Sequence, residues 1–169
     1  EQYVRDARIN MIYEGTNTIQ SLDLLGRKVL GNQGATLKKF GEQITALVMA
    51  EQGNEEMAEF IKPLTQLGQQ MTQFTGEIGY KALQNADEVG AAAVDYLRVA
   101  GHLVLGYFWA RMAQAALQKI AAGDRDPFYL AKVQTARFYF AKLFPETASL
   151  MATARAGSAV LMETEAALA

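Results

Sequence analysis

Apolar residues recur every three or four positions along most of this 169-residue chain, which is the spacing of helices that bury one face. The longest stripe follows Asn54, a predicted N-cap, with Glu55 and Glu56 favourably placed in the first turn. Pro63 is expected to begin or kink this helix. The predicted buried face consists of Met57, Phe60, Ile61, Leu64, Leu67, Met71, Phe74 and Ile78.

The part of the chain before this helix contains shorter helical runs. Residues 2–12 and 16–30 are predicted to be helical, with a break at 14–15 between them. A Gly-Asn-Gln-Gly cluster at 31–34 is the best candidate for a linker and a domain boundary. The stripe that follows ends near Gln52, and its apolar positions are Leu37, Phe40, Ile44, Leu47 and Val48.

The C-terminal half contains the expected centre of the fold. Residues 88–122 are apolar on most sides, which predicts a central helix, and a glycine follows as a C-cap. Asp126 and Pro127 fit the N-cap and first position of the next helix, and Pro145 is expected to start a last short one. The predicted buried face after Pro127 is Leu130, Val133, Phe138, Ala141 and Phe144.

Short connections between these helices favour antiparallel neighbours, and no strand-length alternation occurs. The predicted fold class is therefore all-α, with an antiparallel helical bundle at 34–157, a separate segment at 1–30 and a frayed tail at 158–169. The chain starts at Glu1, with no initiator Met and no cap before its first helix, so we expect it to be part of a longer protein.

Composition narrows the possible functions. The 18 acidic and 16 basic residues are interspersed, which argues against nucleic acid or an anionic membrane as a partner. The absence of cysteine removes disulfides, thiolate metal sites and cysteine nucleophiles, and is compatible with a cytoplasmic location. The most apolar stretch, 89–122, contains Asp95, Arg98, His102 and Arg111, so we interpret it as a buried helix and not a membrane span.

Few residues remain that could carry chemistry. A single histidine and no glycine-rich phosphate loop leave little for metal or nucleotide sites, and we predict no metal site. His102 lies in the apolar helix, where a hydrogen-bonded core residue is the more common role. Asp95 and Arg98 could pair, and core packing explains the aromatic run at 107–109.

Glu14 stands apart because it lies in the break between two helices. Gly15 follows it, and Thr16, Asn17 and Thr18 supply donors that could face a ligand at the start of the next helix. A carboxylate beside a helix N-terminus is also an ordinary stabilising feature. Spacing alone leaves both interpretations open.

The string RDARINMIYEGTNTIQ, residues 5–20, resembles the active-site segment of acyl-CoA dehydrogenases. Extended by SLDLLGRK at 21–28, it is similar to the long bacterial, 3-methylmercaptopropionyl-CoA dehydrogenase-like subfamily. The segments DYLRVAGHLVLGYFWARMA and FYLAKVQTARFYFAKLFP resemble the extra helical domain of that subfamily. The resemblance implies that residues 1–30 end the catalytic C-terminal domain and that 34–157 form an accessory domain.

The resemblance also implies a reaction. The glutamate of the YEGT string is the family's catalytic base, which is Glu14 here, although some relatives carry the base on another helix and a small residue at this position. The base takes the α proton of an acyl-CoA thioester while the β hydrogen leaves as a hydride to FAD, which gives an enoyl-CoA. The backbone N–H of the base helps to polarise the thioester carbonyl. By position, Gly15 contacts substrate, and Thr16, Asn17 and Thr18 contact FAD.

The same resemblance implies an electron-transfer flavoprotein as acceptor and a homo-oligomeric enzyme. The other catalytic domains lie outside this sequence, so the chain alone is expected to be inactive. Two alternatives stay open. One is an acyl-CoA oxidase of the same fold, in which oxygen reoxidises the flavin. The other is a non-catalytic helical assembly module, which is the leading interpretation from about residue 34 onward.

Overall fold

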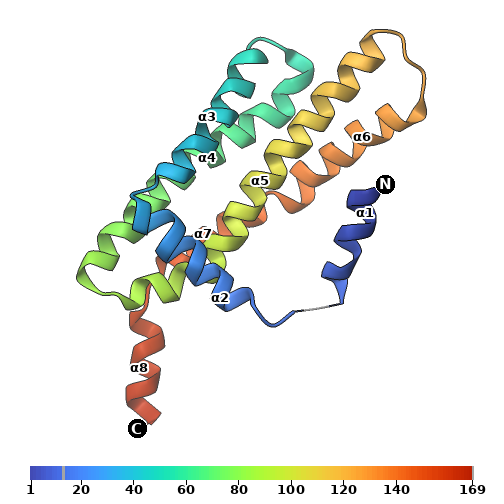
Figure 1. Cartoon of the computed structure of the whole chain (residues 1–169). Coiled ribbons are helices and arrows are strands. Elements are labelled where there is room, and N and C mark those ends of the chain that lie inside the picture. The colour runs from blue at the N-terminus through green and yellow to red at the C-terminus, as the bar shows by residue number, and fades with distance from the viewer. Residues whose placement is uncertain (13, 169) are drawn as a thin grey trace.

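The computed structural model describes residues 1–12 and 14–168, with side chains through 163 (Figure 1). These residues form helices and no strands, which confirms the predicted all-α class and antiparallel bundle. The long helices are α3 (Ala35–Ala50), α4 (Glu55–Gln84), α5 (Asp87–Ala121) and α6 (Pro127–Phe138). The shorter elements are α1 (Gln2–Ala7), η1 (Arg8–Met11), α2 (Asn17–Leu22), η2 (Asp23–Val29), η3 (Leu30–Asn32), η4 (Tyr139–Leu143), α7 (Glu146–Arg155) and α8 (Ala159–Leu168).

Helix α5 is the central helix, as predicted. Helices α4, α6 and α7 pack against it, and so do α2 and η2. Among the described helices α5 alone is long and apolar enough, by length and composition, to cross a membrane, and 33% of its most apolar window is buried. Its several packing partners account for that composition. The predicted C-cap is Gly123 at φ 88°, with Asp124 N–H donating to the Lys119 carbonyl at 3.0 Å.

Helix α4 follows the sequence prediction closely. All eight residues of the predicted stripe are buried. The N-cap is confirmed because the Asn54 side chain accepts from the Glu56 N–H at 3.1 Å. Of the two expected roles of Pro63, beginning the helix is wrong because Pro63 lies inside it, and the kink stays a prediction. Long stripes of this kind predict structure well because only one helical phase buries every apolar residue.

The predicted buried face of α6 was partly wrong. Leu130 and Phe138 are 52% and 57% exposed, and Ala141 is exposed as well. Val133 and Phe144 are buried, as predicted. The buried residues that the prediction missed are Ala136, Tyr139 and Phe140. The π-helical segment η4 begins at Tyr139, so its wider turn shifts the phase of the buried face only from that residue onward. A uniform period of 3.6 residues cannot anticipate that shift.

Gly106 of α5 is required by its neighbours, which leads to a first prediction. A Cβ built at this position would lie 2.6 Å from Cε2 of Phe144. Because that ring is itself buried, Gly106→Ala should destabilise the protein by about 1–3 kcal/mol despite the better helix propensity of alanine. Gly101→Ala, where a Cβ meets nothing within 4 Å, should be neutral or stabilising. Urea unfolding of both variants measures the difference, and equal stabilities would contradict the packing of α5 on Phe144.

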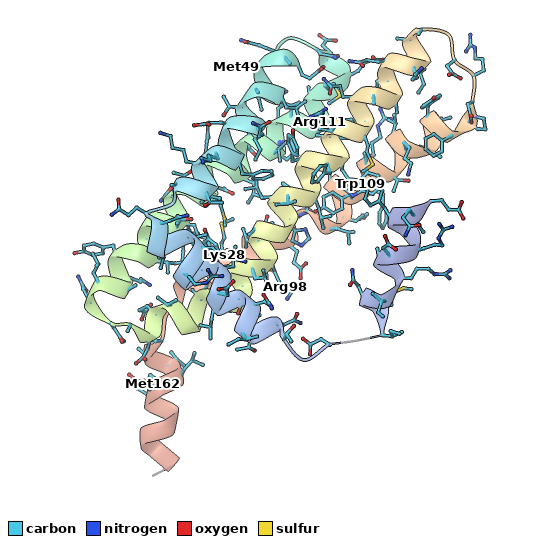
Figure 2. The ribbon with its side chains drawn as sticks, in the orientation of Figure 1. Lys28, Met49, Arg98, Trp109, Arg111 and Met162 are labelled. Carbon is cyan, nitrogen blue, oxygen red and sulfur yellow. The ribbon has the colours of Figure 1, made fainter. Side chains whose placement is uncertain are left out.

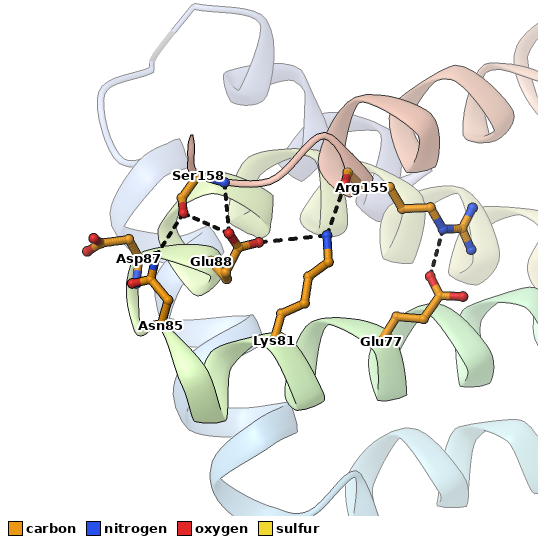
Figure 3. Close-up of polar contacts among 7 residues, drawn as sticks. All are labelled: Glu77, Lys81, Asn85, Asp87, Glu88, Arg155 and Ser158. Carbon is orange, nitrogen blue, oxygen red and sulfur yellow. Dashed lines mark hydrogen bonds and ion pairs between the residues drawn. The ribbon is translucent and has the colours of Figure 1, made fainter. Parts of the chain in front are cut away.

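Residues 159–168 of the expected tail form helix α8, and residue 169 lies outside the described residues, so fraying of this tail stays a prediction. Ser158 is 2% exposed and bonds to Glu88 at the start of α5 (Figure 3). Its N–H and Oγ donate to Glu88 Oε1 at 3.0 and 2.7 Å. Lys81 lies 3.9 Å from the other carboxylate oxygen and donates to the Arg155 carbonyl. These bonds tie the α7–α8 junction to the α4–α5 turn.

The Glu88 cluster gives the bundle a predictable pH dependence. The backbone and side-chain hydrogen bonds from Ser158 lower the pKa of Glu88 below its ordinary value of 4.5. A carboxyl whose pKa is lower in the folded state adds stability above its unfolded pKa and loses that stability as the pH falls through the folded pKa. Glu88→Gln should therefore cost about 1–2 kcal/mol at pH 7, and the deficit should shrink as the pH falls below 4.5. Denaturant unfolding at pH 7 and at a pH below 4.5 measures this loss of stability, with Glu163→Gln as the control. A loss that is as large at the lower pH would refute the stabilising role of the Glu88 carboxylate.

Candidate functional site

Glu14 lies between η1 and α2, as the sequence predicted, and it is exposed. Its Oε1 accepts a hydrogen bond from the Asn17 N–H at 3.2 Å, so the carboxylate caps the first turn of α2. Gly15 between them has φ 133°, a conformation that side chains rarely adopt. The chain thus holds the carboxylate beside a helix N-terminus, which is the stabilising arrangement and also fixes its position.

The residues predicted to contact FAD stand together at the start of α2. Thr16 precedes the helix, and its side chain makes no capping bond. Asn17 and Thr18 form the first turn, and all three side chains are exposed. The structure therefore brings the predicted site residues 14–18 into one short, solvent-facing segment. Their roles in binding substrate and FAD stay predictions.

The residues that follow the 14–18 segment anchor it to the bundle. Ser21 and Leu25 are fully buried, and Val29 is 5% exposed. Leu25 and Val29 belong to the same core cluster as the buried residues of α5. The Ser21 hydroxyl donates to the Thr18 carbonyl at 2.7 Å, which holds the first turn of α2 on its buried base. Residues 17–32 consequently pack on the bundle, and the division at 31–34 stays a prediction.

Segment η2 carries a small ionic cluster, of which Figure 2 labels Lys28. Asp23 bonds to Arg27 and lies 3.0 Å from Lys28 Nζ. Hydrogen bonds from Arg27 and then Lys28 lower the pKa of Asp23 to about 2. These partners account for the basic pair without a ligand.

The histidine has a structural role, as interpreted from the sequence. His102 Nδ1 lies 3.0 Å from the Tyr139 hydroxyl, and Nε2 lies 3.1 Å from Glu146. Burial raises the pKa of Tyr139 to about 12, so the phenol stays protonated. Arg98 bonds to Glu146, and no bond to the suggested partner Asp95 is found in the described part of the chain. The described residues also contain no group of three or more His, Asp or Glu side chains that could hold a metal ion.

The helical bundle matches a known protein family. The model described as acetyl-CoA dehydrogenase C-terminal like matches residues 35–165, which is most of the helical bundle. The chain belongs to this family.

Relatives of the family agree with that assignment. The chain is 34% identical over 154 residues to the broad-specificity linear acyl-CoA dehydrogenase FadE5 of Mycobacterium tuberculosis, and 33% identical over 146 residues to the 3-methylmercaptopropionyl-CoA dehydrogenase of Ruegeria pomeroyi. A butyryl-CoA dehydrogenase of Syntrophomonas wolfei is 27% identical over 148 residues. Each match covers 85–86% of this chain but only 24–25% of the relative. The chain thus spans about a quarter of the length of these relatives.

One feature of this acetyl-CoA dehydrogenase C-terminal-like bundle was missed by sequence reasoning. A groove runs between α3 and α4, and glycines and threonines line much of it. The available signal was the run of small residues at 65, 68, 72, 76 and 79, which recurs at helical spacing within α4. None of residues 14–18 lines this groove, so it is separate from the segment that carries Glu14.

Proposed function

We propose that this chain is the C-terminal part of a flavin-dependent acyl-CoA dehydrogenase and that Glu14 is its catalytic base. The observation that supports this most is the position of Glu14. Its carboxylate lies in a helix break, bonded to the Asn17 N–H, directly before a bundle that belongs to the family. The relatives named as dehydrogenases match the chain over this same bundle.

In the proposed reaction Glu14 takes the α proton of an acyl-CoA thioester. That carbon is too weak an acid for a carboxylate unless the thioester carbonyl is polarised, and the backbone N–H of Glu14 would contribute to this. Glu14 is exposed in this chain. A base of this kind works best out of water, so further domains of the longer protein would cover it.

The segment fits one edge of a flavin site. Thr16, Asn17 and Thr18 are exposed and offer hydroxyl and amide donors, and the first turn of α2 offers backbone N–H donors other than that of Asn17, which Glu14 already accepts. These residues would hold FAD, which accepts the β hydrogen as a hydride. They make up only a small part of such a site, so residues 1–169 alone would be catalytically inactive.

The proposed partners are an acyl-CoA substrate and an electron-transfer flavoprotein. We propose that the longer protein is a homo-oligomer in the cytoplasm.

Assays of the longer protein with and without oxygen separate a dehydrogenase from an oxidase. A dehydrogenase passes electrons from acyl-CoA to a dye or flavoprotein without oxygen and forms little peroxide. Rapid peroxide formation in air would instead support the oxidase of the same fold.

A second candidate is an assembly role for the helical bundle. Helix α5 exposes Val94, Leu105 and Phe108 at 42%, 51% and 54%, and α1 leaves Tyr3 90% exposed. Exposed apolar residues in this number commonly mark contact surfaces. Truncation of the longer protein after Lys28 tests this role, because it should weaken oligomerisation or stability. Unchanged assembly, stability and turnover would count against it.

A further inference from the structure

The groove between α3 and α4 has a volume of about 800 Å³ and reaches Leu103 of α5 at its base. Such a volume lies within the range of small-molecule sites. The apolar residues that line it are Leu30, Leu37, Ile44, Val48, Met71 and Leu103. A hollow of this size and lining fits an apolar ligand better than a polar one.

The threonines of the groove do not make it polar. Each hydroxyl that lines it donates to a carbonyl one turn earlier in its own helix. These bonds are Thr45 to Gly41 at 2.9 Å, Thr65 to Ile61 at 2.8 Å, Thr72 to Gly68 at 3.2 Å and Thr75 to Met71 at 2.7 Å. Because the hydroxyl protons are already donated, these threonines offer a ligand only their oxygens as acceptors. The other polar side chains that line the groove are Gln33, Lys38, Glu42 and Gln69.

Glycines keep the groove open. Gly41, Gly68 and Gly76 lie within helices, and a Cβ built at each meets no heavy atom within 4 Å. Glycine is a poor helix former compared with alanine, and the packing of the chain gives no reason for it at these positions. Side chains there would occupy the groove, so the absence of side chains preserves its depth.

One end of the groove favours an anion. Helix α3 begins there at Gly34, which has no side chain to cap the helix, and no acid lies in its first turn. Lys38 lines the groove one turn further on, and no ion pair within the described residues involves it. The positive helix end and the ammonium together attract negative charge. Glu42 follows one turn later, which confines this preference to the Gly34 end.

From Gly34 to Val48 helix α3 rises about 21 Å, which is close to the length of an extended long-chain fatty acid. We propose that the α3–α4 groove binds one long acyl chain, with its anionic end at the N-terminus of α3 beside Lys38. A free fatty acid and the acyl chain of a coenzyme A thioester share this chemistry. The site lies away from Glu14, and the proposal does not depend on the dehydrogenase activity.

The fluorescent fatty acid cis-parinaric acid tests the groove in the chain of residues 1–169. We expect saturable binding of one probe per chain and displacement by palmitate or palmitoyl-CoA, and the better competitor identifies the source of the acyl chain. Gly68→Leu places a side chain in the groove and should weaken binding at least tenfold. Gly101→Leu, at another helical glycine with open space but outside the groove, should change it less than twofold. Circular dichroism melts establish that both variants fold.

The anionic end has its own test. Lys38→Glu should weaken palmitate binding about fivefold or more and leave hexadecanol binding unchanged, whereas Lys62→Glu on the exposed side of α4 should affect neither. Equal losses for palmitate and hexadecanol would overturn the placement of the anion. No saturable probe binding, or a Gly68→Leu variant that binds as well as the wild type, would overturn the site itself. Failure of flavin chemistry in the longer protein would affect neither result.

Discussion

Glu14→Gln in the longer dehydrogenase is expected to lower acyl-CoA turnover about 100- to 10,000-fold, the usual contribution of a general base. Glutamine keeps the size of the side chain and can still accept the Asn17 N–H through its amide oxygen. The loss should therefore come from proton abstraction and not from the start of α2. Steady-state turnover and flavin reduction by acyl-CoA under single-turnover conditions measure it directly.

The control for this variant is a carboxylate outside the string at 5–20. Glu55 is exposed in the first turn of α4. Glu55→Gln should retain turnover within about twofold, because it lies outside the site. FAD content should match the wild type in both variants. A Glu14→Gln enzyme with normal turnover and intact FAD would remove Glu14 from the role of base.

Phe60→Ala is expected to cost about 3–5 kcal/mol of unfolding free energy, a large part of the stability of an ordinary domain. Phe60 of α4 is fully buried, and its ring lies 5.5 Å from that of Phe140 in η4. Removing the ring leaves a cavity between the two helical segments, which the long, rigid α4 cannot close. Urea or thermal unfolding of residues 1–169 measures the loss.

An exposed phenylalanine provides the matched control. Phe138 is 57% exposed although the sequence pattern placed it in the core. Phe138→Ala should cost about 0.5 kcal/mol or less. If the two substitutions cost the same, the exposed position of Phe138 at the end of α6 would be wrong, since Phe138 and Phe60 would then be equally buried.

Most of the bundle could be predicted because its signals are local. The stripe of α4, its N-cap Asn54 and the Asp126 cap of α6 each depend on residues within one or two turns. The predictions failed where structure depends on distant contacts. The π-helical segment after α6 places Tyr139 and Phe140 in the core, and the bonds between Ser158 and Glu88 tie the start of the C-terminal segment to α5.

The candidate site shows a different limit. The break at Glu14 is visible in the pattern, but spacing alone does not separate a cap from a base, and the observed bond to Asn17 is compatible with both. Glu14 is proposed as the base because the continuous string at 5–20 resembles the active-site segment of acyl-CoA dehydrogenases. The α3–α4 groove could not be predicted, because glycines that preserve a hollow and glycines that permit close packing look alike in sequence.

The most direct test of the central proposal is the flavin absorbance and acyl-CoA-dependent dye reduction of the longer protein, measured beside residues 1–169. We predict bound FAD and turnover in the longer protein and neither in the isolated chain. A longer protein without flavin and without turnover would contradict the proposal, and the helical assembly role would then become the primary function of the chain.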